Sequence, residues 1–435
     1  MRLKQIMIGA ASAIAITSMS TAAFAGAVTS KEEIAVSTTG GGIKIQSDNG
    51  NTFQFGGRIM YDMDFYDGLY NSNFTDDNAG DNSSEAEFRR TRLEVKGSSG
   101  ENWNYELAVD VDEGETRIQT GFITYKGLGF ADVHLGRFKV PFGLEELGSS
   151  KWVTSIERSP TTELGFLFNI PSFSLGLTGH TDSLFWGASI VDEDNEDEAG
   201  KDAYSLAGRV GGHFNIGDNS FMHLAASYAS RDFGDDGSQR FRTRLGVHTT
   251  ERITVNNAER FGVDDADQFG LEAAGVFGPF SLQGEYREAN YDEGNDIAAT
   301  PGLNDAGQRV SDVDIEGYYL QASYLLTGES RVYKGEKGIF DKVKPKGPRG
   351  AWELVAKYEE GEVDVDVLGD QAEFELLTLG VNWYANNNLK FMLNYLDGDT
   401  DGFTSAAGDA LNGSTNANVD DEDGSAISFR TQYVF

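Results

Sequence analysis

The segment WNYELAVDV, residues 103–111, alternates apolar and polar side chains along its whole length. Every odd-numbered position is large and apolar, whereas the even-numbered positions include Glu106 and Asp110. Successive side chains of a β-strand point to opposite faces, so one face of this segment must meet an apolar medium and the other must meet water. The same pattern recurs at residues 352–359 and 389–396, which predicts a sheet with one apolar and one wet face.

The length and the ends of these segments distinguish a membrane sheet from a soluble sandwich, which would alternate in the same way. The segments run for about 9 to 12 residues, enough to cross a hydrocarbon core at a tilt, whereas soluble strands are usually nearer 5 or 6. Aromatic residues end many apolar faces, as Tyr318 and Tyr324 do on either side of Leu320, and such girdles mark membrane interfaces. Lipid cannot hydrogen-bond a backbone, so the strands must close into a barrel.

Connections of alternating length predict the orientation and the number of strands. Short links such as 97–102 and 216–220 are expected to be periplasmic turns, and long links such as 139–172 and 231–265 are expected to be external loops. Counting in this way predicts an all-β protein, a transmembrane antiparallel β-barrel of about 16 strands. One periplasmic link, Thr327 to Gly350, is unusually long for a turn.

The two ends of the chain predict export to the outer membrane of a Gram-negative bacterium. Residues 1–25 combine two cations, an apolar stretch and a terminal small-residue pattern, as a secretory signal peptide does. Residues 26–50 are expected to form a short polar segment, and residues 51–435 the barrel domain. The last predicted strand ends in Phe435, which resembles the signal that the barrel-assembly machinery reads.

Charge and composition exclude several classes of protein. Acidic residues outnumber basic ones by 70 to 35, which gives a formal net charge of −35 and argues against nucleic acid as a partner. The absence of cysteine removes disulfides and thiolate sites. The histidines lack metal-site spacing, and neither a GxSxG nor a P-loop motif occurs, so we expect no enzymatic activity, no metal site and no cofactor.

Several blocks of sequence carry a likeness to one known family. They are FQFGGRIMYD at residues 53–62, EFRRTRLEVKG at 87–97, GRFKVPFGLEELGSSKWVTSIERS at 136–159, TGESRVYKGEKGIF at 327–340 and GPRGAWELVAKY at 347–358. By these blocks the chain resembles the phosphate-selective porin O and P family. The resemblance implies a sixteen-stranded barrel that assembles as a homotrimer, with a long third external loop folded inward to narrow the pore.

Three arginines near residue 90 are candidates for an anion site. The resemblance implies that Arg89 and Arg90 line the centre of the pore. The alternation of the strand also places Arg90 and Arg92 on the face opposite Leu93, hence in the lumen. Arg89 falls on the other face, so it reaches the lumen only if a β-bulge reverses the alternation before it.

Five further cations acquire roles from the same likeness. The resemblance implies that Lys139 and Lys151 belong to the constriction loop, although the two glutamates between them are possible ion-pair partners. It also implies that Arg240, Arg242 and Arg244 lead anions inward from the fifth loop. Because residues two apart share a face of an extended segment, these arginines would form a row of positive charge, which we call the arginine ladder. The alternative is an ordinary porin lumen, in which arginines face loop carboxylates and select little.

Two hypotheses of function remain open at this point. In the first, the chain is an outer-membrane porin, a passive channel for small hydrophilic solutes, with anions such as phosphate or polyphosphate as substrates. A non-selective or cation-preferring pore is its nearest rival, because acidic loops at the mouth would repel phosphate, most strongly at low ionic strength. In the second, a structural or adhesive outer-membrane protein binds cations or surfaces with those loops. Membrane lipid and lipopolysaccharide are expected partners of either.

Overall fold

The structure is a computed structural model of the chain. It describes residues 34–38, 42–70, 83–112, 115–166, 173–192, 203–234, 237–255, 260–294, 309–405 and 422–435. The predicted signal peptide, residues 1–25, lies outside this part of the chain. Within it, no helix has both the length and the apolar character needed to cross a membrane.

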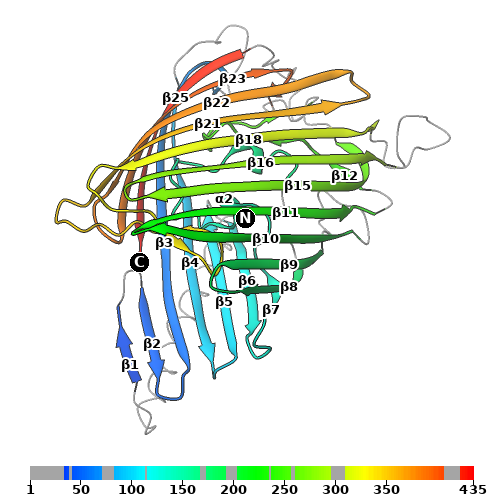
Figure 1. Cartoon of the computed structure of the whole chain (residues 1–435). Coiled ribbons are helices and arrows are strands. Elements are labelled where there is room, and N and C mark those ends of the chain that lie inside the picture. The colour runs from blue at the N-terminus through cyan, green and yellow to red at the C-terminus, as the bar shows by residue number, and fades with distance from the viewer. Residues whose placement is uncertain are drawn as a thin grey trace, which may run out of the picture.

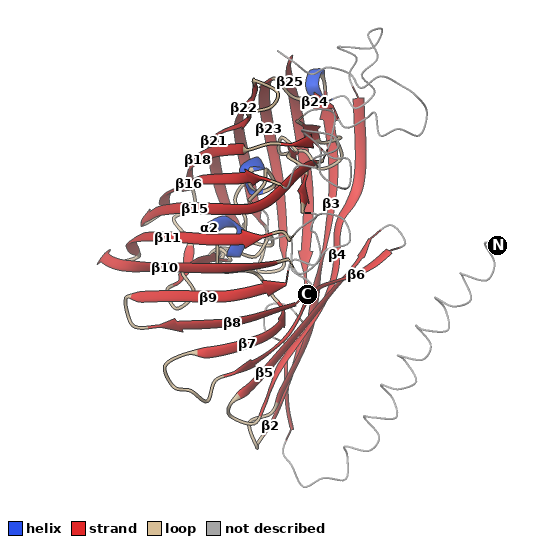
Figure 2. Cartoon of the chain, turned by 90° about the vertical axis from the view of Figure 1, so that its right-hand side faces the viewer, coloured by secondary structure: helices blue, strands red, loops and turns tan. Residues whose placement is uncertain are grey.

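Sixteen strands form a closed antiparallel barrel (Figure 1 and Figure 2). In chain order they are β3 (Thr52–Tyr66), β4 (Ser83–Ser99), β5 (Trp103–Asp112), β6 (Glu115–Tyr125), β7 (Asp132–Arg137), β8 (Phe173–His180), β9 (Leu184–Asp192), β10 (Tyr204–Gly217), β11 (Ser220–Asp232), β15 (Phe261–Phe277), β16 (Phe280–Glu293), β18 (Val313–Leu325), β21 (Ala351–Val365), β22 (Asp370–Tyr384), β23 (Leu389–Asp401) and β25 (Glu422–Val434). Each strand pairs with the next along the chain, and β25 pairs with β3 to close the ring. The predicted barrel is therefore confirmed.

The remaining elements are short. They are β1 (Ile34–Ser37), β2 (Ile43–Ser47), β12 (Ser238–Gln239), β13 (Arg242–Thr243), β14 (Ile253–Thr254), β17 (Arg309–Val310), β19 (Val332–Lys334), β20 (Ile339–Asp341), β24 (Thr404–Ser405), the 3-10 helices η1 (Gly68–Tyr70) and η2 (Pro160–Thr162), and the helix α2 (Leu144–Leu147). β1 and β2 form a hairpin at the lower left of Figure 1, and β2 pairs with β3. Both strands lie in the described part of residues 26–50, the predicted short polar segment, and they extend the sheet beyond β3.

The outer surface of the barrel is apolar, as the alternation of the sequence predicts. Along β23, Leu393 and Tyr395 are exposed, whereas Asn394 between them is buried in the interior. On neighbouring strands the indole rings of Trp352 and Trp383 stack with their centroids 5.5 Å apart. Aromatic side chains of this kind mark the edge of the lipid-facing band of an outer-membrane barrel.

A β-bulge in β4 decides the direction of Arg89. Met60 of β3 lies opposite Arg90, but Asp62, two residues further along β3, lies opposite Glu87, three residues back along β4. β4 therefore holds one residue more than β3 between these two pairs, and the extra residue reverses the alternation. As a result the side chain of Arg89 points into the barrel beside Arg90, where both reach the same acidic side chain.

Three connections fold into the interior of the barrel. The constriction loop, residues 138–166 between β7 and β8, carries α2, which lies inside the ring of strands in Figure 2. The arginine loop, residues 237–255, lies between β11 and β15 and carries β12, β13 and β14. The periplasmic link, residues 326–350, lies between β18 and β21 and contains the hairpin β19–β20.

Apolar contacts of the arginine loop fill one side of the lumen. A cluster of buried side chains joins this loop to the inner faces of strands from β15 to β25 and to the last residue of β3, Tyr66. The cluster includes Phe241, Leu245, Tyr291, Ile315 and Phe374. Apolar side chains packed inside a barrel leave no room for water or solutes there. The solute path is therefore displaced toward the opposite wall, which β3, β4, β5 and β6 form.

Polar contacts inside the barrel account for the unusual length of the periplasmic link. The hydroxyl of Tyr333 and Nδ1 of His223 are 2.6 Å apart. The guanidinium of Arg209 donates to the backbone carbonyls of Lys337 and Gly338, at 3.1 and 2.8 Å. These contacts fasten the link to β10 and β11 from within, so it is an inward fold and not an ordinary turn.

We predict that Leu320→Arg lowers the free energy of unfolding by about 2–4 kcal/mol, because Leu320 lies on the lipid-facing surface between Tyr318 and Tyr324. Asp399→Arg, on the same surface nearer the external end, should change it by only about 0–1 kcal/mol. Urea unfolding in lipid vesicles measures both variants. Equally small effects would contradict the assignment of this surface to lipid.

Candidate functional site

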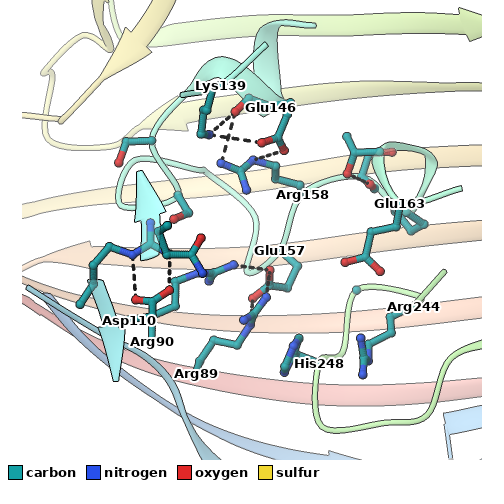
Figure 3. A pocket seen from close by; sticks show the side chains of 18 of the residues that line it. Arg89, Arg90, Asp110, Lys139, Glu146, Glu157, Arg158, Glu163, Arg244 and His248 are labelled. Atoms are coloured by element: carbon teal, nitrogen blue, oxygen red, sulfur yellow. Dashed lines mark hydrogen bonds and ion pairs between the residues drawn. The ribbon is translucent and has the colours of Figure 1, made fainter. Parts of the chain in front are cut away.

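A cavity of about 480 Å³ lies between the β3–β6 wall and the two inward external loops (Figure 3). Nine of its lining side chains are cationic and four are acidic. The cationic side chains are Arg58, Arg89, Arg90, Arg92, Arg117, Lys139, Arg158, Arg244 and Arg252, and the acidic ones are Asp110, Glu146, Glu157 and Glu163. The cavity thus has a positive excess, although the whole chain carries a formal charge of −35.

Four charged side chains form a row across the wall of the cavity. Arg58 of β3 lies opposite Arg92 of β4, Arg92 opposite Asp110 of β5, and Asp110 opposite Arg117 of β6. Arg92 binds Asp110 with two hydrogen bonds, of which the one from Nε is 2.8 Å long. Like charges directly opposite on neighbouring strands are destabilising, so the position of Arg58 beside Arg92 needs a reason other than stability.

Arg58 is the least compensated of these cations. Its side chain is 2% exposed, and its hydrogen bond from Nη1 to Ser149 Oγ is 3.5 Å long. Its Nε is buried without a hydrogen-bond partner, and no carboxylate of the described residues lies within ion-pair distance. Glu94 and Asp110 offset the charge of Arg58 only from a distance. A buried guanidinium without a carboxylate in contact is costly, and an anion in the cavity would reduce that cost.

The constriction loop places one carboxylate among the wall arginines. Glu157 accepts hydrogen bonds from Arg89 at 2.8 and 3.1 Å and from Arg90 at 3.4 Å, and it also pairs with Arg430 of β25. Burial by itself would raise the pKa of Glu157, but the guanidinium groups of Arg89, Arg90 and Arg430 outweigh it and hold the pKa well below its usual range. Glu157 is therefore a permanent negative charge among the cations of the cavity.

Lys139 and Arg158 share a second carboxylate of the constriction loop. Glu146 lies 3.4 Å from Lys139 Nζ and 3.3 Å from Arg158 Nε. Both cations also donate to the backbone carbonyl of Gly148, at 2.9 Å. Burial, followed by the charge of Arg158, lowers the pKa of Lys139 to about 7. Lys139 therefore carries a charge that depends on pH near neutrality.

Lys151 is not among the side chains that line the cavity, although the family resemblance implied a pore role for it. Its Nζ is 2.8 and 3.0 Å from the carboxylate oxygens of Glu94 on β4. Glu145, the other glutamate between the two lysines, pairs instead with Lys357 of β21. Whether Lys151 contributes to anion binding stays a prediction.

The three predicted arginines of the arginine loop alternate with buried residues, as a shared face of an extended segment requires. Arg240, Arg242 and Arg244 are partly exposed, whereas the alternate residues Phe241 and Thr243 are buried. Of the three arginines, Arg244 lines the cavity, and its Nε donates to the carbonyl of residue 250 at 2.9 Å. The alternation expected for an arginine ladder is present, and its role in anion transfer stays a prediction.

Four cations of the cavity were not predicted from the sequence. Arg58 and Arg117 carried a signal, because each lies at an inward position of an alternating strand, as Arg92 does. Arg158 and Arg252 lie in loops, where no periodicity says which way a side chain points. Such residues become identifiable only once the loops are seen to fold into the barrel.

The comparisons with known proteins agree with this geometry. The model of the family described as phosphate-selective porin O and P matches residues 53–435. The chain belongs to the phosphate-selective porin O and P family. It is also 32% identical to Porin O of Pseudomonas aeruginosa, over 98% of this chain and 98% of that protein. The protein is therefore an outer-membrane porin, a β-barrel that forms a channel.

Solved porin structures share the fold. An outer membrane protein of Vibrio cholerae, OmpT, matches with a TM-score of 0.54 at 14% identity, over 89% of this porin and 98% of that chain. An anion-selective porin from Comamonas acidovorans matches with a TM-score of 0.52 at 15% identity, over 88% of this porin and all of that chain. At such identities the likeness concerns the barrel and not the residues of the cavity.

We predict that anion selectivity falls as the pH rises from about 6 to 8, because Lys139, whose pKa is about 7, loses its positive charge over that range. Reversal potentials under a KCl gradient in planar bilayers measure the change. Lys139→Arg stays charged and should remove the pH dependence. A dependence that persists in Lys139→Arg would contradict the assignment.

Proposed function

We propose that this porin is an anion-selective channel that binds phosphate-like oxyanions in the cavity. The observation that carries the proposal is the directly opposed pair Arg58 and Arg92, of which Arg58 lacks a carboxylate partner among the described residues. A guanidinium presents a fork of donors that matches the oxygens of phosphate. An oxyanion between these strands would supply the missing negative charge.

Transport through the cavity would proceed by exchange between neighbouring cations. A path lined by fixed positive charges concentrates anions and offers each one a next partner before the last releases it. Arg244 of the arginine loop lines the cavity from one side, and Arg58, Arg89 and Arg90 line it from the wall. We propose that anions pass from the arginine ladder to this wall.

The acidity of the chain does not oppose this proposal. Salt screens charges in water over about 8 Å at physiological ionic strength. Screening is weaker for charges that are buried or partly buried, as those inside the cavity are. The side chains that line the cavity therefore set its potential, and they are mainly cationic. Exposed carboxylates at the external strand ends, such as Asp399 and Asp401, are not among these lining side chains.

Two names among the similar proteins also support anion transport. The matched family is described as phosphate-selective, and the solved porin from Comamonas acidovorans is described as anion-selective. We propose further that the protein is a passive channel and not an enzyme. A homotrimer in contact with lipid and lipopolysaccharide, assembled by the barrel-assembly machinery, is the proposed state. The trimeric form known for OmpT of Vibrio cholerae supports the oligomer.

We predict that Arg58→Ala raises the phosphate concentration for half-block of the chloride current by about 10- to 100-fold, because a hydrogen bond to a charged group contributes about 1.5–3 kcal/mol. Titration of phosphate against single channels in planar bilayers measures the block. Arg349→Ala, an exposed cation of the periplasmic link, is the control and should leave the block unchanged. The same block in both variants would contradict the proposed site.

The arginine ladder has its own test. Replacing Arg242 and Arg244 together by Ala should weaken the phosphate block and lower the conductance at low salt, because anions would lose the cations that concentrate them. The loss should shrink as the ionic strength rises. Conductance measured over a range of salt concentrations checks both statements. An unchanged current and block would contradict the ladder.

A further inference from the structure

We propose that Glu157 is the exchange ligand of the pore. Its carboxylate holds the guanidinium groups of Arg89 and Arg90 when no anion is bound, yields them to an entering anion, and takes them back as the anion leaves. This inference rests on the proposed anion selectivity and names the group that sets how tightly anions bind. A carboxylate suits the role because it offers a guanidinium the same pair of oxygens that phosphate does.

The contacts of Glu157 are those that an anion would make. Arg89 donates to both carboxylate oxygens, at 2.8 and 3.1 Å, and Arg90 donates to Oε2 at 3.4 Å. The three side chains are 10 to 16% exposed and all line the cavity. Figure 3 shows Glu157 reaching from the constriction loop toward the two arginines of the wall. The donors are therefore accessible to an anion and already occupied.

The constriction loop is held in position by several contacts besides the ion pair of Glu157 with Arg430. Side chains of β22 and β23 bind the backbone of residues 153–156 on the N-terminal side of Glu157. Asn382 donates to a carbonyl at 2.8 Å, Lys390 donates to the preceding one at 2.8 Å, and Asn394 accepts from an amide at 2.9 Å. With these anchors and the pair with Arg430, the loop does not also need Glu157 to bind Arg89 and Arg90. Occupying those two arginines is therefore the distinct effect of this carboxylate.

A tethered competitor has a definite consequence for transport. Because Glu157 is attached beside its arginines, its effective concentration there is at least in the millimolar range that short tethers give. Any anion must displace it, so the apparent affinity of the site is lowered. The same competition speeds release, and conduction requires a site that is both occupied readily and left readily.

Removing the charge of Glu157 should separate affinity from throughput. In Glu157→Gln, the half-blocking concentration of inorganic phosphate should fall at least 10-fold, and the maximal phosphate current should fall as well. A purely structural carboxylate predicts the opposite, a looser pore with weaker block and larger current. Glu163→Gln is the matched control, since Glu163 lines the same cavity on the same loop but approaches only Arg252, at 3.7 Å among the described contacts.

Glu157→Asp keeps the charge and gives a second test if Glu157→Gln fails to assemble. The shorter side chain holds Arg89 less well, so phosphate block should tighten, by less than in Glu157→Gln. The exchange role is supported if the phosphate block tightens more in these two variants than it does in Glu163→Gln. If phosphate blocks these variants no more tightly than it blocks Glu163→Gln, or blocks them more weakly than the unmodified porin, the exchange role is overturned. The proposed anion channel would remain intact in that case. Absence of phosphate block in the unmodified porin overturns the proposed function and this inference together.

Discussion

Hydrocarbon offers no hydrogen-bond partner to a peptide group, and this constraint governs the whole structure. Every spanning strand must pair on both sides, so β25 returns to β3 and the sheet closes. Closure of the barrel fixes the environment of each side chain, because alternate positions along a strand then face lipid and lumen. Charges within the spanning part of the chain consequently collect inside the ring, where they define the channel.

The interior is not a uniform water-filled tube. Apolar packing of the arginine loop fills one side, and the periplasmic link is fastened within the barrel by Arg209 and Tyr333. The open path runs along the β3–β6 wall, where the cavity concentrates cations in a strongly acidic protein. The position of a charge, and not the total, decides which ions the pore admits, since distant charges are screened and lining charges are not.

Sequence patterning predicted the barrel well because period-two alternation is a property of each strand by itself. Residues 103–111 and 389–396 could be assigned to a face without knowing their neighbours, and the condition for Arg89, a β-bulge, could be stated in advance. The site was predicted only in part. Arg90, Arg92 and Lys139 line the cavity as expected, but Lys151 turns away to Glu94, a partner distant in sequence. Loop side chains such as Arg252 depend on tertiary folding that no periodicity encodes.

The zero-current potential of the unmodified porin in a planar bilayer, under a tenfold KCl gradient, measures directly which ion the cavity prefers. We expect the sign that corresponds to chloride permeating faster than potassium, despite the net negative charge of the chain. A potential of the opposite sign, showing that potassium permeates faster, would contradict the claim that the cavity lining determines selectivity.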